Sequence, residues 1–209
     1  MKQNDLTAKN NDYSIFAKMG KKIIALCGTI GSGKTTAGEY LKQKGFSVID
    51  CDDLSRKAAQ DSVILEQIIL NFGEEYVNKG EILRRKLAEK VFGNKKETEK
   101  LNSIFHQKIL KLLVEEILRI KDEVIFVELQ VLNKPFVHLI EEIWLIKTSV
   151  NNAVKRVRDR DGRTEKEVMD IINTQNMQNE QFKCKSRIIN NDSTVKELYL
   201  QIERLLNLI

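Results

Sequence analysis

Short apolar runs alternate with longer amphipathic segments along most of this chain. The runs have the length of buried strands and lie at residues 23–27, 47–49, 124–127, 143–146 and 187–189. Helical periodicity predicts helices over 34–44, over 164–181 and from 194 onward. The last two each open with Thr-x-x-Glu, a capping box in which the hydroxyl and the carboxylate each satisfy a main-chain donor. Strands that alternate with helices predict an α/β fold with a central parallel sheet flanked by helices.

The interval between the second and third apolar runs is much longer than the others. Residues 53–122 contain several helical patterns, including a long one at 97–120. This interval exceeds a single crossover, so we expect a helical lobe at 54–122 inserted into the sheet domain. Residues 1–20 show almost no apolar periodicity and are expected to be a disordered N-terminal extension, with the domain itself spanning 21–209.

The composition fits a chain that buries one core. Of its 209 residues, 42% are hydrophobic and 31% are charged, and no apolar run is long enough to span a membrane. Cys27, Cys51 and Cys184 are odd in number and widely spaced, which argues against a disulfide framework and favours a reducing, cytoplasmic setting. The net charge of +5 indicates an anionic partner without distinguishing a nucleotide from a nucleic acid.

The strongest motif is a phosphate-binding loop of the form G-x-x-x-x-G-K-[ST]. It follows an apolar run and precedes an amphipathic helix, and consists of Gly28, Thr29, Ile30, Gly31, Ser32, Gly33, Lys34 and Thr35, with Thr36 next to it. The glycines allow main-chain N–H groups to curl around phosphate oxygens at the positive end of the helix dipole. We expect Lys34 to bridge the β- and γ-phosphates of ATP and the Thr35 hydroxyl to ligate Mg²⁺. A glycine-rich turn that merely precedes a lysine is the alternative.

Carboxylates end two of the predicted strands, where ligands gather in open α/β sheets. The second run is followed by Asp50, Asp52 and Asp53, and the third ends in Glu128. Either Asp52 or Asp50 could accept a proton from an acceptor hydroxyl or hold Mg²⁺. The alternative is a solvated turn or a helix N-cap, and Asp53 would be a good cap for a helix that begins at Leu54. Glu128 resembles the acid of a Walker B strand, but any buried strand can end in Glu.

A basic cluster follows the fourth apolar run. Arg156, Arg158, Arg160 and Arg163 stand close together, with Gly162 and the Thr164 cap marking a loop. Arginine forks suit phosphate, and arginines that close over a nucleotide would stabilise the charge of phosphoryl transfer. We therefore expect a lid at 156–164. A solvated helix face with Arg–Asp pairs is the alternative.

These features indicate a small kinase among the P-loop classes. The nearest match to the guanine-reading Asn-Lys-x-Asp of a GTPase has Phe136 in place of the Asp. A helicase or transporter ATPase would be longer and would carry further motifs. A short P-loop chain with an inserted helical lobe and an arginine-rich late loop fits a kinase of small metabolites or nucleotides.

The chain also resembles the dephospho-coenzyme A kinase family from about residue 21 to residue 208. Residues 24–36 are similar to that family's opening strand and loop, and 44–56 to its G…VIDAD-x-x-x-R stretch. Later landmarks match in order: Phe72-Gly73, Gly80–Arg84, Leu101–His106, Arg156, Arg160–Gly162, Gln175 and Ile188–Asn191.

The resemblance implies an ATP-dependent phosphotransferase that acts on the ribose 3′-hydroxyl of dephospho-CoA, with ATP and Mg²⁺ as cofactors. It assigns catalysis to Lys34, Asp52 and Arg160, with Asp52 as the base. It assigns nucleotide binding to the loop with Thr36, Arg156 and Arg160, and acceptor binding to Asp52, Arg56, Arg84 and His106. A monomer or weak homo-oligomer without nucleic-acid or membrane partners is expected.

Several positions depart from the family pattern, chiefly on the acceptor side. Gln107 follows His106 where the family has Pro, and Leu83 replaces an Asp. Glu128 replaces another Asp, and Gln130 and Lys134 replace a Pro and a Glu. Three alternatives therefore stay open: another small-metabolite kinase, a non-catalytic ATP-binding regulator, and a nucleic-acid binder. Against the last stands the lack of a basic helix with interleaved aromatic residues.

Overall fold

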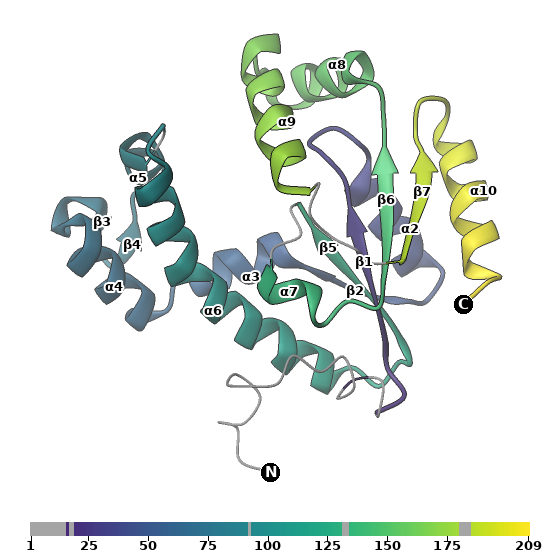
Figure 1. Cartoon of the computed structure of the whole chain (residues 1–209), viewed down its shortest axis with the longest axis horizontal. Coiled ribbons are helices and arrows are strands. Elements are labelled where there is room, and N and C mark those ends of the chain that lie inside the picture. Colours follow the sequence, from purple (N-terminus) through teal and green to yellow (C-terminus); the bar gives the residue numbers. More distant parts are fainter. Residues whose placement is uncertain (1–15, 17–18, 92, 131–133, 180–184) are drawn as a thin grey trace. The chain divides into compact units, whose positions relative to one another are not determined.

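A computed structural model describes residues 16, 19–91, 93–130, 134–179 and 185–209 of the chain (Figure 1). Most of the expected N-terminal extension, residues 1–20, lies outside the described residues. The described chain divides into two compact units. The first is formed by the segments before Asp50 and after Arg119, and the second is Asp50–Arg119.

The first unit is built on a five-stranded sheet. The strand order is β2 (Ser47–Asp50), β5 (Val124–Leu129), β1 (Lys22–Cys27), β6 (Glu142–Lys147) and β7 (Lys185–Asn190). β1 pairs in parallel with both β5 and β6, and β6 pairs in parallel with β7. Each predicted apolar run lies in one of these strands, so the predicted α/β fold with a parallel sheet is confirmed. β1 is the central strand, which places the loop after it in the middle of the sheet's carboxyl edge.

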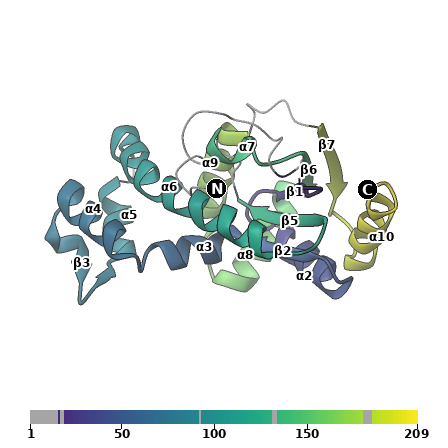
Figure 2. The ribbon, with the colours of Figure 1, turned by 90° about the horizontal axis from the view of Figure 1, so that it is seen from below.

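Five helices accompany this sheet within the described residues. They are α2 (Lys34–Gln43), α7 (Lys134–Val137), α8 (Val150–Asp161), α9 (Glu165–Asn179) and α10 (Val195–Leu206). α2 and α10 lie side by side against one face of the sheet, where they bury Leu41, Phe126, Trp144 and Ile202 (Figure 2). α8 and α9 pack on each other through a smaller apolar cluster of Val157, Val168 and Ile172.

Both predicted capping sites are present. The Thr164 Oγ1 accepts a hydrogen bond from the Glu167 main-chain N at 3.3 Å, and the Glu167 carboxylate accepts one from the Thr164 main-chain N at 2.8 Å. The Thr194 hydroxyl caps α10 by accepting from the main-chain N of Glu197 at 3.2 Å.

The second unit consists of helices and one short hairpin. Its elements are α3 (Cys51–Ala58), α4 (Ser62–Phe72), the 3₁₀ turn η2 (Glu74–Tyr76), β3 (Val77–Asn78), β4 (Glu81–Ile82), α5 (Arg84–Val91) and α6 (Lys95–Arg119). Its core contains Ile64, Ile68, Phe72, Tyr76, Leu87 and Val91. The hairpin was not predicted, because its strands are only two residues long. Its turn residues, Lys79 and Gly80, have φ of 49° and 78°, as in a type I′ hairpin turn.

None of the helices in the described part of the chain is long and apolar enough to cross a membrane.

Candidate functional site

The loop between β1 and α2 leads directly into the first turn of a helix. Gly33 stands at the N-cap of α2 with φ of 97°, a left-handed conformation that favours glycine. No side chain within the described residues caps the first turn of α2, and that turn contains no acidic residue. The first-turn N–H groups and the helix dipole can therefore act on an external anion.

Three residues from the last third of the chain hold this loop in shape. The Gln175 Oε1 on α9 accepts a hydrogen bond from the Ile30 main-chain N at 2.8 Å. The Asn191 Nδ2, just after β7, donates to the main-chain oxygen of Ser32 at 2.7 Å. The Arg156 Nη1 on α8 donates to the Gly31 oxygen at 3.3 Å, and its Nη2 donates to the Asn191 oxygen at 2.9 Å. The loop is thus pre-organised by side chains before any phosphate arrives.

Lys34 and Thr35 occupy the positions from which the motif acts. The Lys34 Nζ lies 3.3 Å from the Glu128 Oε2 at the end of β5, and both side chains are largely buried. Thr35 is exposed at the first turn of α2, so its hydroxyl is accessible to a ligand. The Ser32 hydroxyl is buried without a hydrogen-bond partner among the described residues, which leaves one further polar group in the loop. This donor set fits a triphosphate with its Mg²⁺.

The two arginines expected to bind ATP are engaged differently. Arg156 is tied to main-chain oxygens of the loop and of Asn191, so in this arrangement it supports the loop. Arg160 forms a two-point ion pair with Asp161, at 2.7 Å from Nε and 2.8 Å from Nη2. The pair raises the pKa of Arg160 and lowers the pKa of Asp161. Arg160 is largely exposed, and such surface pairs are weak enough to exchange partners.

Asp50, Asp52 and Asp53 lie at the start of α3. α3 begins at Cys51, and its N-cap is Asp50, whose Oδ1 accepts a hydrogen bond from the Asp52 main-chain N at 2.8 Å. The alternative in which Asp53 caps a helix from Leu54 is therefore wrong, because the helix starts directly at the end of β2. Asp53 instead pairs with Arg56 one turn later. Asp50 is used as a cap, and Asp52 lies partly exposed in the first turn of α3.

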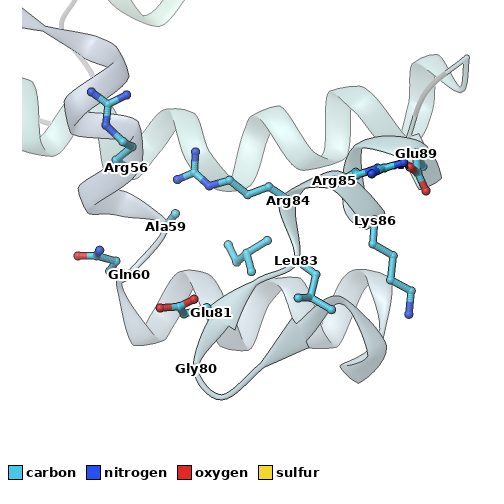
Figure 3. Close-up of a pocket in the computed structure, with 11 residues that line it drawn as sticks. Arg56, Ala59, Gln60, Gly80, Glu81, Leu83, Arg84, Arg85, Lys86 and Glu89 are labelled. Carbon is cyan, nitrogen blue, oxygen red and sulfur yellow. Dashed lines mark hydrogen bonds and ion pairs between the residues drawn. The ribbon is translucent and has the colours of Figure 1, made fainter.

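Two of the acceptor-binding candidates line one cavity of the second unit. The cavity measures about 960 Å³, and its lining includes Arg56, Gln60, Ile82, Arg84 and Lys86. Figure 3 shows the Arg84 side chain extending toward the helix that carries Arg56. Leu83 also lines this cavity and is partly exposed. The lining also contains two carboxylates, Glu81 and Glu89, beside four cationic side chains, so the cavity has a net positive charge that suits an anionic ligand.

His106 and three positions that depart from the family pattern, Gln107, Gln130 and Lys134, are not among the residues that line this cavity. His106 is half-buried on α6, where burial lowers its pKa, and the residues that line the cavity do not include it. Gln107 and Gln130 are exposed. The Lys134 side chain lies outside the described part of the structure.

The hydrogen bonds that Gln175 and Asn191 form with the loop were not predicted from residue chemistry. The resemblance marked both positions, but nothing in their local sequence indicates a contact with a loop so far away along the chain. The same holds for the contact between Glu128 and Lys34, because a strand-ending acid is common in any buried sheet.

Comparisons with known proteins identify the family of the chain. Residues 22–197 match the family model described as CoaE, dephospho-CoA kinase. The chain is 35% identical to the dephospho-CoA kinase of Dehalococcoides mccartyi, over 85% of this chain and 92% of that one. It is 32% identical to the one from Fusobacterium nucleatum, over 89% and 97%. The crystal structure of TT1252 from Thermus thermophilus superimposes with a TM-score of 0.78 and 26% identity, covering 90% of this chain and 98% of that one. The chain therefore belongs to the dephospho-CoA kinase family.

Proposed function

We propose that this chain is a dephospho-CoA kinase, which transfers the γ-phosphate of ATP to the ribose 3′-hydroxyl of dephospho-CoA, the last step of coenzyme A biosynthesis. The observation that carries this proposal is the braced loop after β1, with the first turn of α2 open to an anion, in a chain of this family. The reaction needs no covalent intermediate, so positioning and charge stabilisation account for most of the catalysis.

The nucleotide side is assigned to the loop and α2. Main-chain N–H groups of Gly28–Thr36 bind the phosphates of ATP, and Lys34 places its charge between the β- and γ-phosphates. Mg²⁺, which the exposed Thr35 hydroxyl would help to hold, supplies neutralising charge on the phosphate oxygens when bound.

The acceptor side is assigned to the second unit. Asp52 accepts the proton of the 3′-hydroxyl as that oxygen attacks the γ-phosphorus. Its place in the first turn of α3, two residues after the end of β2, supports this role, because Asp50 and not Asp52 caps that helix. Arg56 and Arg84 bind anionic groups of the acceptor in their shared cavity, and His106 contributes from α6.

Residues 156–164 are assigned to a lid. Arg160 exchanges its exposed Asp161 partner for phosphate oxygens when the lid closes, which stabilises the transferring group and excludes water. Arg156 supports the loop through its contacts with the main-chain oxygens of Gly31 and Asn191 and adds positive charge beside the bound nucleotide.

An ADP-release assay with a panel of acceptors tests the proposal. Dephospho-CoA should raise ADP release far above the rate with water alone, and nucleoside monophosphates or small metabolites should not. Lys34→Ala should abolish the acceptor-dependent rate. A nucleotide or metabolite preferred over dephospho-CoA would indicate another small kinase. Tight ATP binding without transfer to any acceptor would indicate a non-catalytic regulator.

We further propose that the enzyme works in the cytoplasm as a monomer or a weak homo-oligomer. Reaction on freely diffusing small molecules requires neither nucleic acid nor membrane. Light scattering coupled to gel filtration checks the assembly state, and a single species of high order would contradict this part of the proposal.

A further inference from the structure

A glycine in the interior of α2 has a structural reason that lies in another element. Gly38 is buried in the helix and is not among the glycines with positive φ, so the main chain does not require glycine there. Glycine also weakens a helix interior relative to alanine. A Cβ built on Gly38 would overlap the Glu128 Oε1 and press against its Cδ. The missing side chain is therefore the space that the Glu128 carboxylate occupies.

The same carboxylate holds the lysine of the phosphate-binding loop. Lys34 precedes Gly38 by one helical turn, so both residues face the same way along α2. The Lys34 Nζ lies 3.3 Å from the Glu128 Oε2, with 12% and 4% of the two side chains exposed. Glu128 stands opposite Leu26 in the pairing of β5 with β1, the strand that leads into the loop. One carboxylate oxygen of Glu128 thus contacts the Lys34 ammonium, and the other occupies the space that a side chain on Gly38 would need.

We propose that Gly38 and Glu128 form a matched pair that positions Lys34 for the phosphates of ATP. Glu128 is a positioning residue, because it acts through Lys34. A lysine side chain has several rotatable bonds, and holding its ammonium at the loop in advance lowers the entropy cost of ordering it on the nucleotide. The carboxylate reaches this place only because residue 38 has no side chain. The inference rests on ATP binding at the loop, as in the proposed function.

A double-mutant cycle between residues 38 and 128 tests the pair. ATP binding is measured by calorimetry without any acceptor, and stability by thermal unfolding. Helix propensity alone predicts that Gly38→Ala leaves ATP affinity unchanged and raises stability. The matched pair predicts the opposite: the methyl group displaces the carboxylate toward the loop, and ATP affinity falls about tenfold or more.

Shortening the side chain of residue 128 should restore the ATP affinity that Gly38→Ala removes. The Gly38→Ala/Glu128→Asp double variant should bind ATP within about threefold of Glu128→Asp alone, because the shorter side chain clears the new methyl group. If Gly38→Ala does not fold but the double variant does, the pair is supported equally. Wild-type affinity in Gly38→Ala overturns the proposal. The proposal is also overturned if Gly38→Ala lowers ATP affinity by the same factor in Glu128→Asp as in the wild-type protein.

The Lys34→Ala variant shows whether Gly38→Ala weakens ATP binding by displacing Lys34. In Lys34→Ala, adding Gly38→Ala should no longer weaken ATP binding, although its effect on stability should remain. An equal loss of ATP affinity with and without Lys34 would overturn the positioning role. Glu39→Ala, an exposed change in the same helix, serves as the control and should leave affinity unchanged. A wild-type protein that binds no ATP would instead overturn the proposed function.

Discussion

Asn191 clamps the phosphate-binding loop by donating a hydrogen bond of 2.7 Å from its Nδ2 to the main-chain oxygen of Ser32. Both residues are buried, and the amide also lies where a side chain on Gly33 would have to go. Its own main-chain N donates to the Lys147 oxygen, so the clamp is anchored at the end of β6. The last strand of the sheet thus helps to shape a loop that follows the first.

Asn191→Ala should weaken ATP binding, because the loop loses a buried hydrogen bond and with it part of its pre-organised shape. A loss of about 1–2 kcal/mol corresponds to about a 5- to 30-fold rise in the KM for ATP. The KM for the acceptor should change little. Asn190→Ala is a matched control, since Asn190 is exposed and uses its main-chain groups to contact Gln201. Equal effects of the two changes would contradict the clamp.

Substitution of Asp52 should lower kcat far more than substitution of Asp50. Asp52→Asn removes the proposed base and should lower kcat by about 10²–10⁴-fold while the protein stays folded. Asp50→Asn should be mild, because asparagine caps a helix about as well as aspartate. Steady-state kinetics with both substrates, alongside circular dichroism, makes the comparison. A reversed order of severity would assign the base to Asp50.

The stability of the protein should depend on His106 below neutral pH. Burial lowers the pKa of His106 from 6.5, so between the folded and unfolded pKa values the unfolded state binds more protons. Stability is therefore fully present above about pH 6.5 and falls as the pH drops toward the folded pKa. Melting temperatures between pH 7.5 and 5.5 should fall more steeply for the wild type than for His106→Gln. Identical slopes would show that His106 is not the group responsible.

A buried carboxylate at the other end of the sheet should matter for stability. Glu142 is 1% exposed, and it pairs with Lys22 at 3.2 Å and with Arg187 on β7. Burial raises its pKa, but hydrogen bonds from Arg187 and Trp144 and the ion pair with Lys22 outweigh that effect, so the pKa is lowered and the group is held ionised. Glu142→Gln would leave two cations close together without their counter-charge.

The expected cost of Glu142→Gln is about 2–3 kcal/mol in the free energy of unfolding. It is less than for a fully buried pair, since Lys22 and Arg187 keep 24% and 21% of their side chains exposed. Urea denaturation measures it. Glu99→Gln breaks an exposed pair with Lys95 and should change stability by less than about 0.5 kcal/mol. Equal values for the two variants would refute a special role for Glu142.

Local pattern was sufficient for most of the fold and for the loop itself. Each strand of the five-stranded sheet could be predicted, because a buried strand needs a short apolar run. The loop could be predicted because its glycines and its lysine are adjacent along the chain. The start of α3 was misplaced because three closely spaced acidic positions offer several caps, and only the end of β2 decides among Asp50, Asp52 and Asp53.

Long-range contacts limited the rest of the site. Gln175 and Asn191 reach the loop only through packing of α9 and β7, which sequence periodicity does not encode. Gly38 gave no signal at all, since a glycine in a helix has many explanations until the Glu128 carboxylate is seen beside it. The contacts of Arg156 with the main-chain oxygens of Gly31 and Asn191 could not be predicted either, because they depend on how α8 packs beside the loop.

Product identity tests the central claim most directly. The purified chain should be incubated with ATP, Mg²⁺ and dephospho-CoA, and the product compared with authentic coenzyme A by mass spectrometry and phosphorus NMR. The account predicts one added phosphate on the ribose 3′-oxygen, formed in proportion to ADP and absent with Lys34→Ala. ADP formed without a phosphorylated acceptor, or phosphate on a different hydroxyl, would contradict it.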